Sequence, residues 1–410
     1  MVPKGWSLGD FHSFKVSTID GDRGKNYPKK EDYLASGYAL FLGADNIADG
    51  SLNSGKSIYI SKEKHDAMRK GIVRDNDILL VMRGNGTGRS CIYTNKIKSS
   101  AARINSGLVI IRHDAEFTNV EYLHQLLQSP VIQKQFESFM FGSAQPQLTI
   151  QLLKKLKFLA APLPEQRKIA QILSTWDKAI TTTERLLSNR QQQKNALMQR
   201  LLTGKQRFAG FEGEWSQIFL GQVTDSFSGG TPSRSKSEYY GGNIPWIKSG
   251  EVNDRFISNV EESITQLGLD NSSAKIVPSN SILVAMYGAT AGKVAINLIN
   301  AAVNQAVLAI VPKENICLYF LFYFLEYQMD KTLRLVQGGQ PNLNAGIIKD
   351  ILINLPCLAE QQKIASVLSA ADAEIATIQN QLDNLKLQKK ALMQQLLTGK
   401  RRVKVDEAAA

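Results

Sequence analysis

The strongest constraint on this fold is a long segment that the chain contains twice. Glu165–Arg207 and Glu360–Arg402 align without a gap at an offset of 195 residues, and more than half of their positions are identical. Each copy ends in the same run, ALMQxLLTGK, at Ala196–Lys205 and Ala391–Lys400. Two copies are too few and too far apart for a solenoid. The repeat therefore predicts two similar halves related by a pseudo-two-fold axis.

Apolar residues in both copies recur at alternating steps of four and three, which is the period of a coiled-coil seam. The seam residues are Ile169, Leu173, Trp176, Ile180, Leu187, Leu197 and Leu201 in the first copy, and Ile364, Leu368, Ile375, Ile378, Leu382, Leu385, Leu392 and Leu396 in the second. Polar residues interrupt the seam at Thr183, Arg190, Lys194 and Lys389. These breaks, and the outer faces of the helices, are expected to dock partner proteins.

Each copy predicts one helix of about 57 Å, at a rise of about 1.5 Å per residue. Gly204 and Gly399 follow the last seam residue, where a C-terminal glycine belongs. A lone helix cannot bury so narrow an apolar stripe, so each needs a partner, and the other copy is the nearest candidate. The alternative is two solvated helices that pack separately on globular domains.

The charge of the chain favours a polyanionic partner. The net charge is +12 at pH 7, with a pI near 9.4. Such an excess favours nucleic acid first and an acidic membrane surface second. A basic protein with no nucleic-acid role is the alternative that charge alone leaves open.

Cysteine usage and hydropathy indicate a cytoplasmic protein. Cys91, Cys317 and Cys357 are widely spaced and odd in number, which argues against a disulfide framework and for a reducing compartment. No secretory signal is visible. The longest apolar run, Leu318–Leu325, is too short for a membrane span and predicts a buried helix. The final residues, 408–410, resemble an artificial tail and are excluded from the fold.

A globular segment precedes each helix, and the two segments share one plan. The predicted domains are 1–160 and 211–355, with helical spacers at 161–210 and 356–407. The first segment predicts strands at Ile78–Met82 and Leu108–Arg112 and a helix from Val120 to about Phe139; the counterparts in the second are Ile282–Met286, Val307–Val311 and Ile316–Met329. The fold class is therefore mixed α/β (α+β), with a common frame and different loops.

The sequence contains no catalytic constellation. Gly288–Lys293 resembles a phosphate-binding loop, but it is one residue short and Val294 stands where Ser or Thr should bind magnesium. The four histidines lack metal-ligand spacing, and no nucleophile–base pair is recognisable. We therefore predict no catalytic residues, no metal and no cofactor bound by this chain.

Polar and basic side chains gather instead on the loops. Amide and guanidinium groups match the edges of adenine and guanine, and lysine and arginine supply sequence-independent phosphate contacts. The candidate DNA-binding residues are Lys25, Lys29, Lys30, Arg83, Asn85, Thr87, Arg89, Asn105 and Gln145 in the first segment, and Arg234, Lys236, Tyr287, Thr290, Lys293, Asn304 and Gln340 in the second. The alternative for each is capping a turn or solvating a face.

These features together resemble one known family, the specificity subunits of type I restriction–modification systems. The matching motifs are Trp6…Leu8-Gly9-Asp10, Gly229-Gly230-Thr231-Pro232-Ser233 with Ile244-Pro245-Trp246-Ile247, the Gly-x-Gln-Pro loops, Leu163-Pro164-Glu165-Gln166-x-Lys168-Ile169, Glu360-Gln361-x-Lys363-Ile364 and both ALMQxLLTGK ends. The order and duplication of the motifs are specific, although no single motif is. The first half lacks counterparts of the Gly-Gly-Thr-Pro-Ser and Ile-Pro-Trp motifs.

The resemblance implies a non-catalytic subunit that reads a bipartite target in double-stranded DNA with two target-recognition domains. It implies two modification subunits as partners, which carry S-adenosylmethionine and methylate adenine, and restriction subunits that join this core. Antiparallel pairing of the two helices returns the chain to the first domain and gives a two-fold that matches the symmetry of DNA. The competing hypothesis is a coiled-coil scaffold without a sequence-specific DNA role. A self-sufficient methyltransferase or nuclease is opposed by the missing cofactor and metal motifs.

Overall fold

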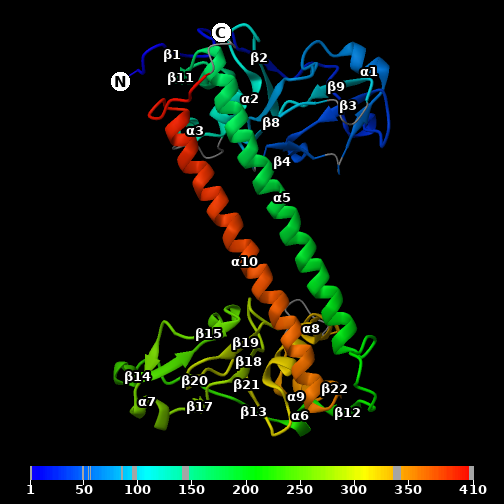
Figure 1. Ribbon diagram of the computed structural model, residues 1–410, viewed down its shortest axis with the longest axis vertical. Helices are drawn as coiled ribbons and strands as arrows, with labels where there is room; N and C mark the ends of the chain where they lie inside the picture. Colours follow the sequence, from blue (N-terminus) through cyan, green and yellow to red (C-terminus); the bar gives the residue numbers. More distant parts are fainter. Residues whose placement is uncertain are drawn as a thin grey trace. The chain divides into compact units, whose positions relative to one another are not determined.

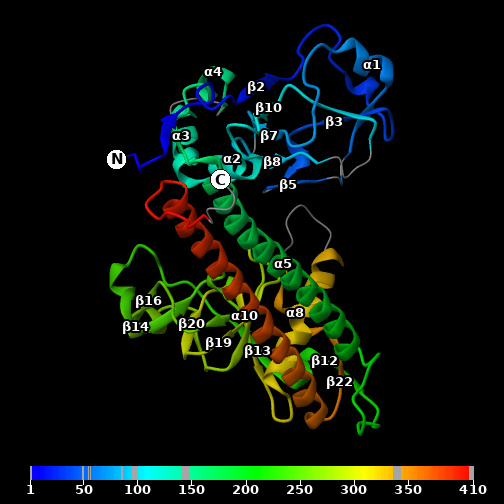
Figure 2. The same ribbon diagram turned by 45° about the horizontal axis from the view of Figure 1, so that its top comes forward.

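A computed structural model describes residues 2–48, 50–53, 55, 57–84, 86–94, 99–140, 147–335 and 343–405 of the chain. The chain divides into two compact units (Figures 1 and 2). Unit 1 is Met1–Glu184 with Asn380–Ala410, and unit 2 is Arg185–Gln379. Each unit thus holds one globular domain and a part of both long helices. Within the described residues, no helix combines the length and the apolar character needed to cross a membrane.

Unit 1 is a mixed α/β domain. Its elements are β1 (Ser7–Gly9), β2 (Ser17–Asp20), η1 (Lys30–Asp32), β3 (Ala39–Leu42), η2 (Ala44–Asn46), β4 (Ile47–Ala48), β5 (Ser51–Leu52), β6 (Tyr59–Ile60), α1 (Lys62–Ala67), β7 (Ile78–Val81), β8 (Ser90–Ile92), β9 (Ala101–Ile104), β10 (Leu108–Arg112), α2 (Val120–Gln128), α3 (Pro130–Met140), α4 (Ile150–Leu153), β11 (Phe158–Ala160) and the start of α5 (Leu163–Leu202). Among the described residues, two larger sheets form, in the orders β2-β10-β7-β8 and β6-β3-β9.

Unit 2 repeats this plan. Its elements are β12 (Ser216–Phe219), α6 (Leu220–Val223), β13 (Thr224–Ser228), η3 (Ser237–Tyr239), β14 (Tyr240–Ile247), η4 (Glu251–Asn253), β15 (Phe256–Ile257), β16 (Ser263–Ile264), α7 (Gln266–Asp270), β17 (Lys275–Val277), β18 (Ser281–Ala285), β19 (Val294–Asn297), β20 (Ala301–Val303), β21 (Val307–Pro312), α8 (Leu318–Leu335), α9 (Ala345–Lys349), β22 (Leu352–Leu355) and the start of α10 (Leu358–Leu396). Its larger sheets run β13-β21-β18-β19-β15 and β16-β14-β20-β17.

The strand order confirms the prediction of one frame used twice. β10 lies between β2 and β7 in unit 1, as β21 lies between β13 and β18 in unit 2, and all four pairings are antiparallel. The second sheet of each unit contains one parallel pair, β3 with β9 and β14 with β20. The central strands are buried apolar runs, so both faces of each sheet are covered.

Two predicted helices differ from the structure. The helix expected at Ile316–Met329 is α8, Leu318–Leu335. The single helix expected from Val120 to about Phe139 is wrong, because two helices, α2 and α3, occupy this stretch. Ser129 between them is extended, with ψ 149°. Pro130 follows it, and proline disfavours the helical conformation in the residue before it. Pro130 then starts α3, where its missing N–H costs no helical hydrogen bond.

The long helices pair antiparallel within each unit. In unit 1, α5 meets the end of α10 through Asp177–Lys389 and Glu184–Lys386. In unit 2, the end of α5 meets the start of α10 through Lys194–Asp372 and Arg190–Glu374. Later residues of one helix thus face earlier residues of the other, which is the antiparallel pairing that was predicted.

Every residue of the predicted seam is buried or half-buried. The ends of the seam join the domain cores: Leu173 and Leu396 belong to the core of unit 1, and Leu201 and Leu368 to that of unit 2. The three charged breaks of the seam are engaged within the chain. Arg190, Lys194 and Lys389 are ion-paired with the facing helix, and the hydroxyl of Thr183 donates to the Ala179 carbonyl.

A Glu-Gln pair at the start of each copy fastens the helix to its domain. Gln166 accepts from the Asn119 N–H and donates to the carbonyls of Ala161 and Phe117. Gln361 makes the corresponding three bonds, with Cys317, Pro356 and Asn315. The neighbouring glutamates, Glu165 and Glu360, are buried and bind Arg402 and Arg207, respectively. Residues at the same position of the repeat therefore make the same contacts in both units.

Candidate nucleic-acid interface

The loops that carry the candidate residues of unit 1 meet at one edge of its main sheet. The end of β2 (Asp20), the end of β7 (Val81) and the start of β10 (Leu108) are register neighbours at this edge. Three segments lie next to these strand ends: the loop 83–89, the turn 105–107 and the segment at Leu148. The Met82 N–H donates to the Gly107 carbonyl (2.8 Å), and the Leu148 N–H donates to the Met82 carbonyl (2.7 Å). Antiparallel strands thus bring loops far apart in sequence together.

Unit 2 builds the same edge with the same bonds. Ser228 at the end of β13 and Ala285 at the end of β18 flank the start of β21. The Met286 N–H donates to the Ala306 carbonyl, and the Leu343 N–H donates to the Met286 carbonyl, both at 2.8 Å. Four loops lie along this edge, at 229–236, 248–250, 287–293 and 304–306. We call these edges of the two units the loop edges.

The candidates of unit 1 on this edge differ in exposure. Arg83 is exposed, and Thr87 donates its hydroxyl hydrogen to the Gly84 carbonyl (2.7 Å). Arg89 is half-buried and folds back over Gly86, where an added Cβ would lie 2.0 Å from the guanidinium. Gly86 has φ 96°, a conformation that strains any larger residue. Asn85 and Gln145 lie outside the described residues.

Asn105 and Asn304 have a structural role at equivalent turns. The side-chain oxygen of Asn105 accepts from the Gly107 N–H (2.8 Å), and that of Asn304 accepts from the Ala306 N–H (3.1 Å). Each bond closes the turn that leads into the central strand of its sheet. Both side chains remain half-buried at the loop edge. The side-chain oxygens of these two asparagines therefore close turns, which is the simpler of the two interpretations.

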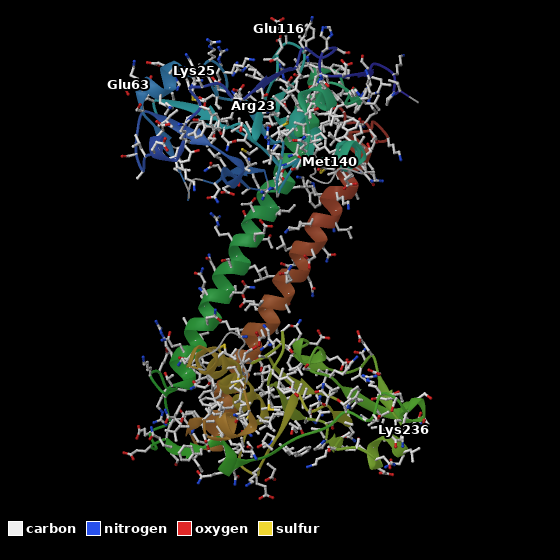
Figure 3. All side chains as sticks on the ribbon, turned by 180° about the vertical axis from the view of Figure 1, so that it is seen from behind. Arg23, Lys25, Glu63, Glu116, Met140 and Lys236 are labelled. Carbon is white, nitrogen blue, oxygen red and sulfur yellow. The ribbon has the colours of Figure 1, made fainter. Side chains whose placement is uncertain are left out.

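The three candidate lysines of unit 1, Lys25, Lys29 and Lys30, are exposed on the segment between β2 and β3. Asp22 shapes this segment, because its carboxylate accepts from the N–H groups of Gly24 (2.8 Å) and Arg69 (2.6 Å). These bonds hold the pKa of Asp22 below its usual value despite burial. Figure 3 shows Arg23 and Lys25 at the surface of this domain. Lys29 lies 3.9 Å from Glu31, and Asp32 pairs with Lys64 of α1, so the segment carries both charges. The three exposed lysines are cations of the kind that suit phosphate contacts.

A buried arginine holds α1 in place. Arg103 is 2% exposed, and its guanidinium donates to the carbonyls of His65, Met68 and Lys70 at 2.6–2.9 Å. These carbonyls lie in the last turn of α1 and just beyond it, and the His65 carbonyl also accepts from the Met68 N–H (3.3 Å). Its Nε also donates to Nδ1 of His65 (3.0 Å), so that ring nitrogen must be unprotonated. Burial, together with the charge of Arg103, lowers the pKa of His65.

The candidates of unit 2 fall into two groups. Tyr287 and Lys293 are exposed on the loop after β18. Thr290 on the same loop donates to the Ser249 carbonyl (2.8 Å) and so joins two loops of the edge. Gln340 lies outside the described residues.

Arg234 and Lys236 are already engaged within the protein. Arg234 forms a two-point ion pair with Glu262 and stacks over Tyr240 (4.5 Å) and Trp246 (5.2 Å). The hydrogen bonds from Arg234 hold the pKa of Glu262 below its usual range. Lys236 donates to the Tyr239 hydroxyl (2.8 Å). Their prediction as phosphate contacts is weakened, because Arg234 in particular shapes the loop 229–236. Figure 3 places Lys236 at the periphery of its domain.

Sequence reasoning missed two polar residues on the edge of unit 2, Thr231 and Gln305. Thr231 donates its hydroxyl hydrogen to Oε1 of Gln305 (2.5 Å). The Gly-Gly-Thr-Pro-Ser motif contains Thr231, but nothing in the sequence pairs it with a residue 74 positions later.

Unit 1 has a hollow of about 430 Å³ beside its loop edge. Its lining includes Tyr33, Phe41, Asp45 and Asn105.

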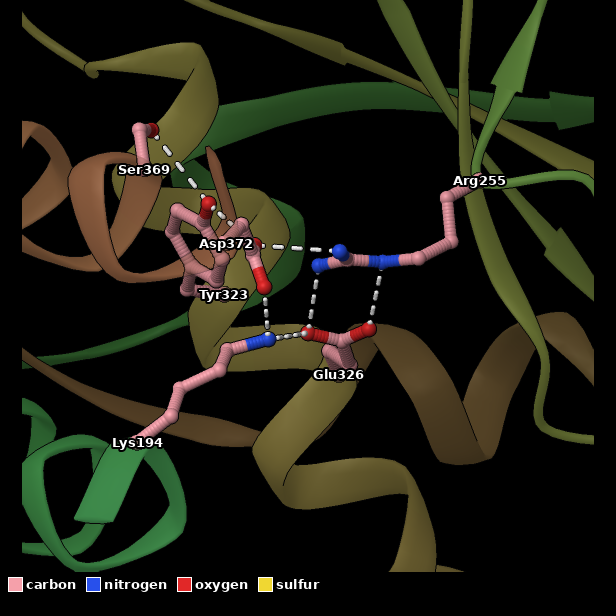
Figure 4. A network of polar contacts seen from close by, with 6 residues as sticks. All are labelled: Lys194, Arg255, Tyr323, Glu326, Ser369 and Asp372. Carbon is pink, nitrogen blue, oxygen red and sulfur yellow. Dashed lines mark hydrogen bonds and ion pairs between the residues drawn. The ribbon is translucent and has the colours of Figure 1, made fainter. Parts of the chain in front are cut away.

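A charged network ties the domain of unit 2 to both helices (Figure 4). Asp372 of α10 binds Lys194 of α5 (2.7 Å), Arg255 (3.0 Å) and the Tyr323 hydroxyl (2.7 Å). Glu326 of α8 binds Arg255 (2.9 Å) from the other side. Burial alone would raise the pKa of Asp372, but the hydrogen bonds from Lys194 and Tyr323 outweigh it and lower that pKa. The loop edge of unit 2 is therefore carried on a domain fixed to the helix pair.

No cluster of three or more histidine, cysteine, aspartate or glutamate residues suited to a metal occurs in the part of the chain that the structure describes. The chemistry available at the loop edges is thus hydrogen bonding and charge, together with exposed aromatic rings such as Tyr287. These are the groups that read base edges and bind phosphates.

Comparison with known proteins identifies relatives over both units. The family model "Type I restriction modification DNA specificity domain" matches residues 9–189 and 212–387. The MjaVIII specificity subunit of Methanocaldococcus jannaschii is 26% identical, over 98% of this chain and 94% of its own. The EcoR124I/EcoR124II specificity subunit of Escherichia coli is 28% identical, but that match covers 50% of this chain and 52% of the relative.

Solved structures share the fold. A chain from a study titled for complex assembly and conformational transition of the type I R-M system gives a TM-score of 0.63 at 20% identity, covering 98% of this chain and 100% of its own. The S subunit from M. genitalium gives 0.58 at 16% identity, covering 97% and 96%. At these identities the likeness concerns the fold alone.

Proposed function

The chain belongs to the type I restriction modification DNA specificity family, and on this premise we propose that it reads DNA sequence for a type I restriction–modification complex without catalysing a reaction itself. Each unit reads one half of a bipartite target in double-stranded DNA. The observation that supports this most directly is the loop edge, which occurs once in each unit on the same hydrogen-bonded frame. The frame is shared, but the side chains on it differ, so the two half-sites have different sequences.

The two long helices connect the readers and set the spacing between the half-sites. α5 starts in unit 1 and ends in unit 2, and its 40 residues correspond to about 60 Å of continuous helix. The exposed faces of α5 and α10 carry many uncharged polar residues, such as the run Gln191–Gln193. We assign the docking of two modification subunits to these outer faces, because the charged breaks of the seam are occupied within the chain.

Catalysis belongs to the partners in this proposal. The modification subunits would bind S-adenosylmethionine and methylate adenine, and restriction subunits would join the same core. The net charge of +12 favours binding of this chain to DNA, on which the modification and restriction subunits act. The site of action is then the cytoplasm, where that DNA is found.

Selection from a random pool of DNA duplexes tests the proposal. The full chain is mixed with the pool alone and together with the modification subunit, and bound duplexes are sequenced. Enrichment of one bipartite sequence supports a sequence reader. Indifferent binding, or none, together with an intact complex, instead supports a coiled-coil scaffold without a DNA-reading role.

Substitutions on the loop edges assign each half-site to a unit. Lys293→Ala should change the preference or affinity at one half-site, and Arg83→Ala at the other, while the complex stays assembled. Lys313→Ala is the matched control, because Lys313 follows the opposite end of β21. An effect of both edge variants on the same half-site would contradict the assignment of one unit to each half-site.

An insertion in the helices tests the spacing role separately. One additional heptad in α5 and one in α10, placed at matching positions, should lengthen the spacer that the complex tolerates between unchanged half-sites. Selection from a library with variable spacers measures this. An unchanged optimal spacer would show that the helices do not set the distance.

A further inference from the structure

Two loops of the unit 2 edge are joined by one bond between exposed side chains. The Thr231 hydroxyl on the loop 229–236 donates to Oε1 of Gln305 on the turn 304–306, at 2.5 Å. Gln305 is exposed, and its Nε2 group has no hydrogen-bond partner among the described residues. In this bond Oε1 faces the Thr231 hydroxyl, so Nε2 is the end of the amide that faces outward.

The loop that presents Thr231 is rigid. Gly229 packs on the Val303 carbonyl so closely that an added Cβ would lie 1.8 Å from its oxygen, and the Gly230 N–H donates to the same carbonyl (3.1 Å). Trp246 donates from its indole N–H to the Gly230 carbonyl (3.2 Å), and the Tyr240 hydroxyl donates to the Pro232 carbonyl (2.5 Å). The hydroxyl of Thr231 is thus held by supports on both sides of it in the sequence.

The turn that presents Gln305 is held equally well. The Asn304 N–H donates to the Ile247 carbonyl (3.0 Å), and the Asn304 side chain accepts from the Ala306 N–H (3.1 Å). Residues before and after Gln305 are therefore fixed, and Thr231 fixes its side chain. Groups held by such a supporting layer discriminate between ligands better than freely rotating ones.

Resting on the proposed function, we propose that Gln305 is a specificity-determining residue that presents its Nε2 hydrogens to a base in the major groove. Because Oε1 is engaged by Thr231, Gln305 acts as a hydrogen-bond donor. It favours guanine, which presents two acceptors, N7 and O6, or thymine through O4, over adenine, which presents the single acceptor N7 beside its N6 donor. The two-point contact of a glutamine with adenine needs the amide oxygen as an acceptor, so adenine is disfavoured.

Unit 1 joins the corresponding loops through a backbone donor instead, because the Ser106 N–H donates to the Tyr27 hydroxyl (3.3 Å). Ser106 follows Asn105 at the corresponding turn, and Arg23 on the preceding loop pairs with Asp20 (3.2 Å). The half-site read by unit 1 is therefore an internal control, because substitutions at Thr231 and Gln305 should leave it unchanged.

The experiment is selection from randomised half-sites with the full chain and its modification subunits. Gln305→Glu replaces the donor by an acceptor, so the preference at one position should move to cytosine, whose N4 amino group donates. Thr231→Val removes the orienting hydroxyl and keeps the shape. It should admit adenine at that position and reduce discrimination by roughly fivefold or more.

Two further variants act as controls. Thr231→Ser keeps the hydroxyl and should keep the wild-type preference. Gln217→Glu makes the same charge change on an exposed glutamine of β12, outside the loop edge, and should leave every position unchanged.

The outcomes separate this inference from the function on which it rests. If the wild-type complex selects a bipartite sequence but Gln305→Glu and Thr231→Val alter only affinity, the bond is a structural tie between loops and the inference is wrong. If the wild-type complex selects no sequence at all, the proposed function fails and this inference fails with it. A change in the half-site of unit 1 would also overturn it.

Discussion

Asp177 of unit 1 and Asp372 of unit 2 occupy the same position of the repeat, yet their surroundings differ. Each binds the equivalent lysine of the facing helix, Lys389 at 2.5 Å and Lys194 at 2.7 Å. Asp177 receives one further bond, from Gln125, whereas Asp372 receives Tyr323 and Arg255. The Asp177 side chain is 41% exposed and the Asp372 side chain 20%.

The difference follows from the helix that each domain packs beside the pair. Asn119 and Cys317 are equivalent, because their N–H groups donate to Gln166 and Gln361. Counting along the chain from these two residues, Gln125 is equivalent to Tyr323 and Gln128 to Glu326. Unit 2 therefore adds a carboxylate, Glu326, and balances it with Arg255. The helix-to-helix contact is common to both units, and each domain has its own support. A frame of this kind lets the reading domains diverge while the helices keep their pairing.

The largest expected effect is the loss of Asp372. Asp372→Ala removes one of the two carboxylates that Lys194 and Arg255 share, and Glu326 is the one that remains. The Lys194 side chain is 11% exposed. Removing one member of a buried charge network costs about 3 kcal/mol, whereas Asp177→Ala in the more exposed setting should cost about 1 kcal/mol. Urea unfolding measures both losses, and hydrogen exchange of α8 and α2 assigns each to its unit. Equal losses would contradict the comparison.

The next effect concerns contacts in which the units are alike. Glu165→Gln and Glu360→Gln each remove a buried carboxylate that holds an arginine and a tryptophan indole, Trp6 or Trp215. Because the partners are the same, each substitution should lower the thermal midpoint by several degrees, and by nearly the same amount. Calorimetry of the full chain measures this. A large inequality would show that the repeat does not make the two anchors equivalent.

A smaller effect separates the units by pH. All four histidines lie in unit 1, and burial lowers the pKa of both His65 and His124. A lowered pKa favours the neutral ring in the folded state, so its full contribution to stability is present above about pH 6.5 and is lost as pH falls through the folded pKa. Hydrogen exchange at about pH 7.5 and about pH 5, on either side of the ordinary histidine pKa, should show weaker protection of unit 1 in acid and little change in unit 2. His65→Gln should reduce the difference, and equal change in both units would refute it.

The smallest effect concerns the strand pairs β1–β11 and β12–β22. Unit 1 closes its pair with an exposed ion pair, Asp10–Lys157 (2.8 Å), where unit 2 has the exposed apolar pair Phe219 and Leu352. The hydrogen bond from Lys157 lowers the pKa of Asp10, so the contribution is present above the usual carboxyl range and disappears in acid. Raising the salt concentration should weaken the contribution of the Asp10–Lys157 pair slightly and that of the Phe219–Leu352 pair not at all. Asp10→Asn should remove this part of the salt dependence in thermal unfolding.

The sequence by itself determined the repeat, the two long helices and the common plan of the two halves. Heptad spacing and duplication are properties of neighbouring residues, so the order of residues alone places Ile169 and Leu396 on the seam. The buried strands β7 and β10 are predictable for the same reason, since continuous apolar runs bounded by turns indicate them. The break at Pro130 carries a local signal as well, which the apolar period obscures.

Only the tertiary structure decided how the loops meet and which side chains are available. Asn105 and Asn304 use their oxygens to close turns, and Arg234 is held by Glu262, neither of which spacing reveals. The pairing of Thr231 with Gln305 joins residues 74 positions apart. Such contacts depend on strand register and on the packing of the whole domain, which the local pattern of residues does not specify. The helices are therefore predictable from the repeat, whereas the orientation of each reading group requires the folded sheets.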